Sequence, residues 1–167
     1  MAQKRKINHK KSASKKAGAK ASGRKKPADN LDSMLDLLDG IEKETARILK
    51  GNLADDWREN LFEIVMTRVD LAAPHKKRLA RLPEFVRADP AAVPQLARRY
   101  WGTMKRILQL ADAPARKRHV AAFGVLYASI IDTFLKDDTR DHAKTMAALD
   151  KRLGLFGQFV DFCSCER

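Results

Sequence analysis

The stretch VAAFGVLYASIIDTFL, residues 120–135, decides the fold class of this chain of 167 residues. Its large apolar side chains recur at helical spacing, but they cover more than one side of the helix. A helix with an apolar excess needs a second partner, either inside the domain or across a dimer. The side chains in question are Val120, Phe123, Leu126, Tyr127, Ile130, Ile131, Phe134 and Leu135.

Apolar residues follow the same spacing of three and four along the rest of the chain from residue 31 onward. Capping residues, prolines and glycines separate the segments. No stretch alternates with the period of two that is typical of a strand. We predict an all-α domain of five to six helices over residues 31–160, followed by a frayed C-terminus over 161–167. The expected helices span about 31–50, 55–73, a short segment to 86, 89–110 with Asp89 as its cap and Pro90 first, 114–135, and a last helix capped by Thr139.

Residues 1–30 differ in composition from all that follows. They hold 11 Lys and Arg against one acid, a net charge of +10, whereas the other 137 residues hold 23 basic and 20 acidic side chains, a net charge of +3. This segment has too little apolar surface to offset the entropy of ordering, so we expect a disordered Lys-rich tail. Such a polycation is expected to contact the phosphates of DNA or another polyanion without reading sequence. The contacting residues would be Lys4, Arg5, Lys6, Lys10, Lys11, Lys15, Lys16, Lys20, Arg24, Lys25 and Lys26.

Other interpretations of the basic tail stay open. It would also serve as a solubilising segment, and an anionic membrane surface would attract it by the same electrostatics. A mitochondrial presequence is disfavoured because presequences are rich in Arg rather than Lys. The chain shows no run of 18 apolar residues and no apolar signal-peptide core, and its two cysteines fall within the last five residues. We therefore expect a cytoplasmic protein.

No constellation of residues in the sequence is typical of catalysis. We find no Gly-rich phosphate loop, no Gly-x-Ser-x-Gly and no His-Glu-x-x-His, so we predict no enzyme activity and no cofactor. Cys163 and Cys165 offer two thiolates where zinc normally takes four ligands, so we predict no metal site. The string DDTRD, residues 137–141, has the spacing of the magnesium-diphosphate motif of all-helical isoprenoid synthases, but no second acidic motif accompanies it. We interpret it as a turn between two helices.

Two segments resemble a subgroup of TetR-type transcriptional regulators that is common in bacteria. LFEIVMTRVD, residues 61–70, with Pro74 and His75 after it, is similar to the subgroup's LFD-hydrophobic-MRRFDALxPHR segment. FLKDD, residues 134–138, and TMAALDKRL, residues 145–153, resemble its WLxDDxPDxxxTMAALDRRL ending. A related branch is the TetR-like, lipid-binding family of ubiquinone-biosynthesis accessory proteins. The resemblance covers roughly residues 40–155 and implies the regulator's C-terminal domain, a helical bundle with an internal apolar cavity that dimerises through its last two long helices.

One departure from that family bears on function. A complete TetR-type regulator begins with a helix-turn-helix module of about three helices, whereas here the Lys-rich tail and a single helix precede the matched segments. Two functions follow from the resemblance. One is a non-enzymatic regulatory protein whose tail contacts DNA non-specifically, and the other is a lipid- or quinone-binding accessory protein. A structural dimer without a ligand is a third interpretation.

The resemblance and the residues together suggest a ligand pocket and a dimer interface. Large aromatic side chains beside small residues on neighbouring helices favour either close helix approach or room for an apolar small molecule or lipid. The candidate pocket residues are Trp101, Met104, Phe123, Gly124 and Tyr127. The implied homodimer would be isologous and would use the helices near 114–135 and 140–153. Its candidate interface residues are Ile130, Ile131, Phe134, Met146, Leu149 and Leu153.

Overall fold

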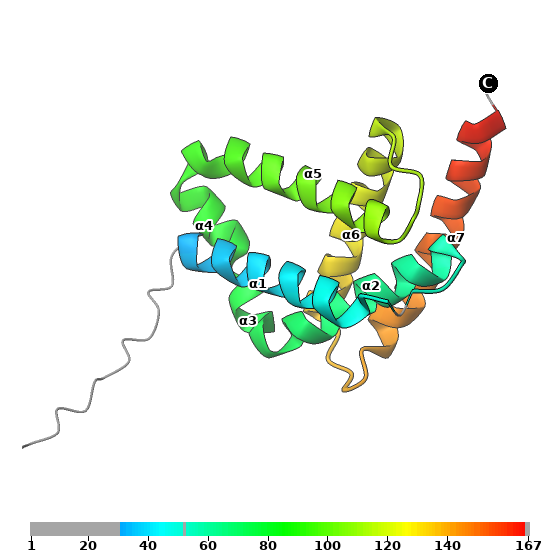
Figure 1. Ribbon diagram of the computed structural model, residues 1–167. Helices are drawn as coiled ribbons and strands as arrows, with labels where there is room; N and C mark the ends of the chain where they lie inside the picture. Colours follow the sequence, from blue (N-terminus) through cyan, green and yellow to red (C-terminus); the bar gives the residue numbers. More distant parts are fainter. Residues whose placement is uncertain (1–30, 52, 166–167) are drawn as a thin grey trace, which may run out of the picture.

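The structure, a computed structural model, describes residues 31–51 and 53–165 (Figure 1). This part of the chain contains helices and no strand, which confirms the predicted all-α class. The elements in chain order are α1 (Leu31–Leu49), α2 (Trp57–Ala72), the 3₁₀ turn η1 (Ala73–His75), α3 (Lys76–Leu79), α4 (Leu82–Ala88), the 3₁₀ turn η2 (Pro90–Ala92), α5 (Val93–Leu110), α6 (Lys117–Lys136) and α7 (Ala143–Cys165).

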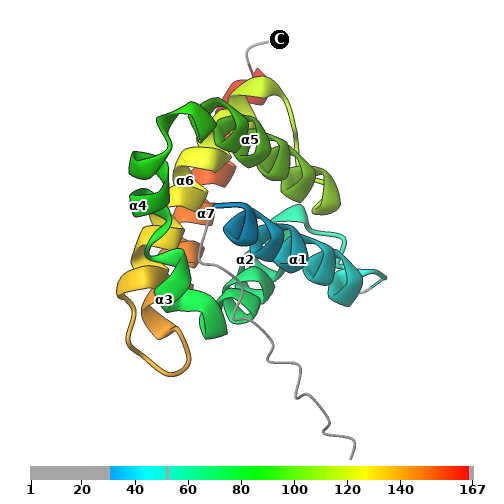
Figure 2. The ribbon, with the colours of Figure 1, turned by 90° about the vertical axis from the view of Figure 1, so that its left-hand side faces the viewer.

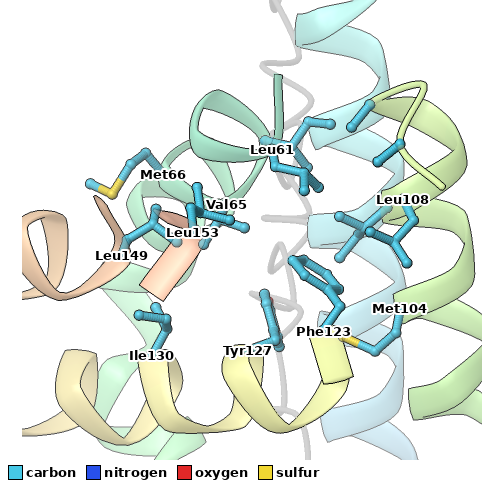
Figure 3. Packing of buried hydrophobic residues seen from close by; sticks show 14 of the residues in the cluster. Leu61, Val65, Met66, Met104, Leu108, Phe123, Tyr127, Ile130, Leu149 and Leu153 are labelled. Carbon is cyan, nitrogen blue, oxygen red and sulfur yellow. The ribbon is translucent and has the colours of Figure 1, made fainter. Parts of the chain in front are cut away.

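The core forms around α2, which contacts α1, α5 and α7. Burying one large aliphatic side chain stabilises a fold by about 1.5–3 kcal/mol, so the apolar face of α2 is a main source of stability. Figure 3 shows side chains from α2, α5, α6 and α7 converging on this cluster. Its buried members include Leu61, Val65, Met104, Leu108, Phe123, Ile130, Leu149 and Leu153.

α6 has neighbours on two sides, as the stretch 120–135 predicts. It contacts α5 on one side and runs antiparallel to α7 on the other. The Phe123 and Phe156 rings lie 5.7 Å apart, and Arg118 donates to the carbonyl of Cys163 at 2.5 Å. Within the described residues, α6 alone has the length and apolar composition of a membrane span, a test that the core helix of a bundle also meets. The second apolar side of α6 therefore finds partners inside the chain.

The start of α5 differs from the sequence-based expectation. Pro90 begins the 3₁₀ turn η2, and α5 itself begins at Val93. The side chain of Asp89 makes no capping hydrogen bond. Pro94 near the start of α5 supplies the fixed φ angle that favours helix initiation, so the helix can begin without the Asp89 cap.

α7 continues to Cys165, past the residue where the sequence predicts fraying. Gly154 and Gly157 each weaken the helix by up to about 1 kcal/mol relative to alanine. Phe156, Val160 and Cys163 offset that cost because they recur on one side of the helix and are buried in the molecule. The expectation of a frayed C-terminus is therefore wrong for residues 161–165.

The α6–α7 connection closes around the buried carboxylate of Asp137. This carboxylate accepts four hydrogen bonds, two from Thr139 (N at 3.0 Å, Oγ1 at 2.5 Å) and two from Thr145 (N at 2.8 Å, Oγ1 at 2.7 Å). Lys76 donates to the Asp137 carbonyl and lies 3.7 Å from the carboxylate of Asp138. Burial by itself would raise the pKa of Asp137, but the hydrogen bonds from Thr139 and Thr145 hold it well below its ordinary value. Asp137 therefore orders the turn that begins α7.

Replacing Asp137 by asparagine is expected to destabilise the fold by about 2–4 kcal/mol, because bonds to a charged acceptor are lost in a buried site. Urea unfolding at pH 7 measures this. Since the pKa of Asp137 is depressed in the folded state, its contribution is complete above the ordinary aspartate pKa of about 3.9 and is lost as the pH falls below it. The difference between the two proteins should therefore shrink below about pH 4.

Asp138→Asn is the matched control, since its side chain is 96% exposed. Its effect on the free energy of unfolding should stay below about 1 kcal/mol, as is usual for exposed ion pairs. Equal destabilisation by the two substitutions would contradict this account of the turn.

Candidate functional site

Polar bonds hold α1 against α5, which lies beside it (Figure 2). Glu42 on α1 accepts hydrogen bonds from Arg106 (Nε at 2.5 Å, Nη2 at 3.2 Å) and from Thr103 at 2.9 Å. Burial by itself would raise the pKa of Glu42, but the bonds from Arg106 and Thr103 hold it below its ordinary value. Arg99 pairs with Asp39 at 3.1 Å one turn further along. Two recesses lie beside these bonds and share residues with them.

The first recess is a surface groove of about 460 Å³ along α5 and α1. Three guanidinium groups and one carboxylate line it, so the groove carries an excess of positive charge. Arg98 is exposed and pairs with no acid in the described part of the chain. Guanidinium groups suit phosphates and carboxylates, so the groove attracts anions. Its lining residues are Asp39, Arg98, Arg99, Gly102, Thr103 and Arg106.

The second recess is a smaller cavity of about 150 Å³ between α1, α2 and α5. Ile64, Ile107 and Leu110 supply apolar walls, and Arg68 supplies a buried charge. The Nε of Arg68 donates to the hydroxyl of Tyr127 at 3.0 Å. A cavity of this size admits a benzene-sized body and is smaller than the 300–1,000 Å³ usual for ligand pockets.

The five predicted pocket residues pack against one another rather than around a space. Met104, Phe123 and Tyr127 are buried in the core. The exposed ring of Trp101 covers Gly124, where an added Cβ would come within 2.2 Å of the ring carbon Cζ3. Close helix approach therefore explains Gly124. The ring of Trp101 fills the space beside Gly124 where the sequence allowed for a ligand. Neither recess is lined by these residues, although Tyr127 contacts the cavity residue Arg68.

Gly124→Ala is expected to destabilise the fold by about 1–3 kcal/mol, because the new methyl group must displace the Trp101 ring. Thermal unfolding followed by tryptophan fluorescence measures both the stability and the ring's environment. Gly102→Ala is the control on α5, since its Cβ would meet only Arg106 at 3.8 Å. That change should stabilise the helix by up to about 1 kcal/mol. Equal stability of the two variants would contradict the packing role of Gly124.

The predicted dimer-interface residues lie mostly in the interior of one chain. Ile130, Phe134, Leu149 and Leu153 are buried in the core, and Ile131 is half-buried. Of the six predicted residues, Met146 alone is exposed. These four belong to the hydrophobic core of the single chain. Met146 and part of Ile131 are thus the members of the set that lie at the surface, and the homodimer itself stays a prediction.

Other apolar side chains of α6 and α7 are exposed. Leu155, Phe159 and Phe162 on α7 share one side by their spacing, and they are 58%, 36% and 66% exposed. The antiparallel register, with Arg152 at the Ser129 carbonyl and Arg118 at that of Cys163, places Val125 level with Leu155. Val125 is 70% exposed. We call Val125, Leu155, Phe159 and Phe162 the α6–α7 strip. The spacing 155, 159, 162 could have indicated it, but the sequence predicted a frayed end there.

The basic residues fall into two groups. The eleven predicted polyanion contacts of the tail lie outside the described residues. A second basic region, residues 74–118, holds 12 Lys and Arg against 3 Asp and Glu, a net charge of +9. It covers α3 to α5 and the start of α6, and it includes Arg98 and Arg99 of the groove. The net charge of residues 31–167 is only +3 and does not reveal this basic region, because the residues outside it hold 11 basic and 17 acidic side chains.

The described residues contain no cluster of three or more His, Cys, Asp or Glu side chains placed to hold a metal ion. Comparison with known proteins finds no matching family model, no matching curated protein and no matching solved structure. The resemblance to TetR-type regulators therefore depends on residues 61–75 and 134–153 alone.

Proposed function

We propose that the chain is a non-enzymatic regulatory protein, of the TetR-like kind, that binds DNA or another polyanion without reading its sequence. The observation that carries this proposal is the net charge of +10 within residues 1–30. Nine of the eleven basic residues there are Lys, which favours point-charge attraction to phosphates over bidentate recognition. Such binding is driven by release of counterions from the nucleic acid.

The charge of residues 74–118 supports the same proposal. A polyanion drawn to the tail meets a second basic surface on the domain, where Arg98 and Arg99 line the groove. Backbone contacts of this kind fix position and carry no sequence information. The domain would thus extend the contact made by the tail.

A second copy of the chain is the partner that we propose for the α6–α7 strip. Monomeric proteins rarely expose large contiguous apolar patches, and such patches mark interaction sites. An isologous dimer places the same strip on both sides of the interface, so apolar side chains meet apolar side chains. Two tails on one dimer would bind a polyanion with higher avidity than one.

The lipid- or quinone-binding alternative has less support. The cavity of about 150 Å³ is too small for a long apolar tail, and the larger groove is lined by arginines. Peripheral contact with an anionic membrane remains an outcome of the binding test, because phospholipid headgroups present the same charge.

The full chain is expected to bind a random-sequence DNA duplex with a strong salt dependence. If eight tail residues meet phosphates, the slope of log affinity against log salt should be about −7. Deleting residues 1–28 should abolish most of this binding and leave the helical circular dichroism unchanged. Fluorescence anisotropy over a salt series measures the slope.

Two comparisons complete this test. Lys43→Gln with Lys50→Gln removes two exposed charges, one on α1 and one just after its end, and should change the slope little. Vesicles of anionic lipid, titrated in parallel, show whether DNA or membrane is preferred. Equal DNA affinity of the full chain and the truncated chain would overturn the proposal, and so would a preference for the vesicles.

Light scattering at micromolar concentration should give twice the 18.8 kDa of one chain. Leu155→Glu with Phe162→Glu should yield the monomer, because charged side chains then face each other across the interface. Val93→Glu on α5 replaces another exposed apolar residue and should leave the dimer intact. A monomeric parent chain, or a dimer that survives the double substitution, would contradict the assignment of the strip.

A further inference from the structure

Arg68 carries a guanidinium group into the core from α2. The residue is 6% exposed, and its Nε donates to the Tyr127 hydroxyl. Its two terminal nitrogens make no hydrogen bond to a described residue, and they are not sealed from solvent. Arginine keeps its proton in proteins, so it cannot relieve its burial by becoming neutral. Buried charges are normally paired, whereas the neighbours of this one are the hydroxyl and the ring of Tyr127, with the ring centroid 5.8 Å from the guanidinium carbon, and no carboxylate bonds to it.

The other charged groups at the cavity do not satisfy Arg68. Glu42 is the only acid among the lining residues, and both of its oxygens accept bonds from Arg106 or Thr103. Arg68 acts on Glu42 only through longer-range attraction. The cavity wall therefore has two guanidinium groups and one carboxylate, a net charge of +1. One further negative charge would balance it.

The remaining lining residues indicate the size and polarity of an anion that would fit the cavity. Ile64, Ile107 and Leu110 are apolar, and the hydroxyl of Thr45 is already used by the carbonyl of Ile41 at 2.7 Å. The volume of about 150 Å³ admits a body of about benzene size. A planar carboxylate matches the fork of a guanidinium group better than a spherical ion does.

We infer that this cavity binds a small carboxylic acid with an apolar body, its carboxylate on Arg68 and its body against Ile64 and Ile107. The inference goes beyond the proposed function and depends on neither the tail nor the α6–α7 strip. A ligand of this class would touch α1, α2 and α5 together, so its binding would stabilise their packing. If the chain fails to bind DNA, the carboxylate inference still stands. If it fails to bind a carboxylate, the proposed function still stands.

Calorimetric titration of the full chain with benzoate and with its neutral analogue benzamide tests the inference. Benzoate should bind at least about tenfold more tightly, which corresponds to one charge-assisted contact. Arg68→Met keeps much of the side-chain volume and should lower benzoate affinity about tenfold while removing the preference over benzamide. Arg47→Met is the control, because Arg47 is exposed on α1 and pairs with Glu44.

A second variant keeps the test decisive if Arg68→Met fails to fold. Ala46 is exposed on α1 and lines the cavity, so Ala46→Trp fills the space from the surface and leaves Arg68 in place. It should abolish benzoate binding with unchanged circular dichroism. Equal affinity for benzoate and benzamide, undiminished binding by Ala46→Trp, or no benzoate binding at millimolar concentration would each overturn the inference and leave a water-filled cavity.

Discussion

α2 is contacted by α1, α5 and α7, and the positions of these helices follow from the need to bury it. The helix brings polar side chains as well as apolar ones into the core, and each must find a partner there. Asn60 is buried and bonds to both the N–H and the carbonyl of Ala54, and it also donates to the carbonyl of Ala111. One side chain thus ties the loop before α2 to the loop after α5. Arg68, two turns later, bonds to Tyr127 of α6 and leaves the cavity beside it.

Charge in this chain is separated by region rather than mixed evenly. The tail and residues 74–118 are basic, and the remaining residues carry more acids than bases. α1 lies at the border, where Asp39 and Glu42 pair with Arg99 and Arg106 of α5. These pairs neutralise part of the basic region, and Arg98 keeps its charge without an acidic partner among the described residues. This separation of charge by region is the feature from which we propose polyanion binding.

α6 and α7 show how one pair of helices serves two purposes. Their inner residues, Phe123 and Phe156 among them, join the core of the chain. Their outer residues form the apolar strip that we assign to a second copy. Because the side chains of a helix change direction by about 100° per residue, neighbouring residues in sequence belong to different surfaces. Phe156 is buried and Leu155 is exposed for this reason alone.

The sequence by itself determined the helical class, the approximate extent of α1, α2, α5 and α6, and the change in composition after residue 30. These properties depend on local spacing and composition, which can be read without knowing what lies nearby. Tertiary structure decided which apolar residues are buried, so Phe134 and Leu149 entered the core and Phe162 stayed outside. It also decided that Trp101 fills the space beside Gly124 and that Arg68 lines a cavity. Contacts between residues far apart in the chain depend on how whole helices pack, and a single sequence does not record that arrangement.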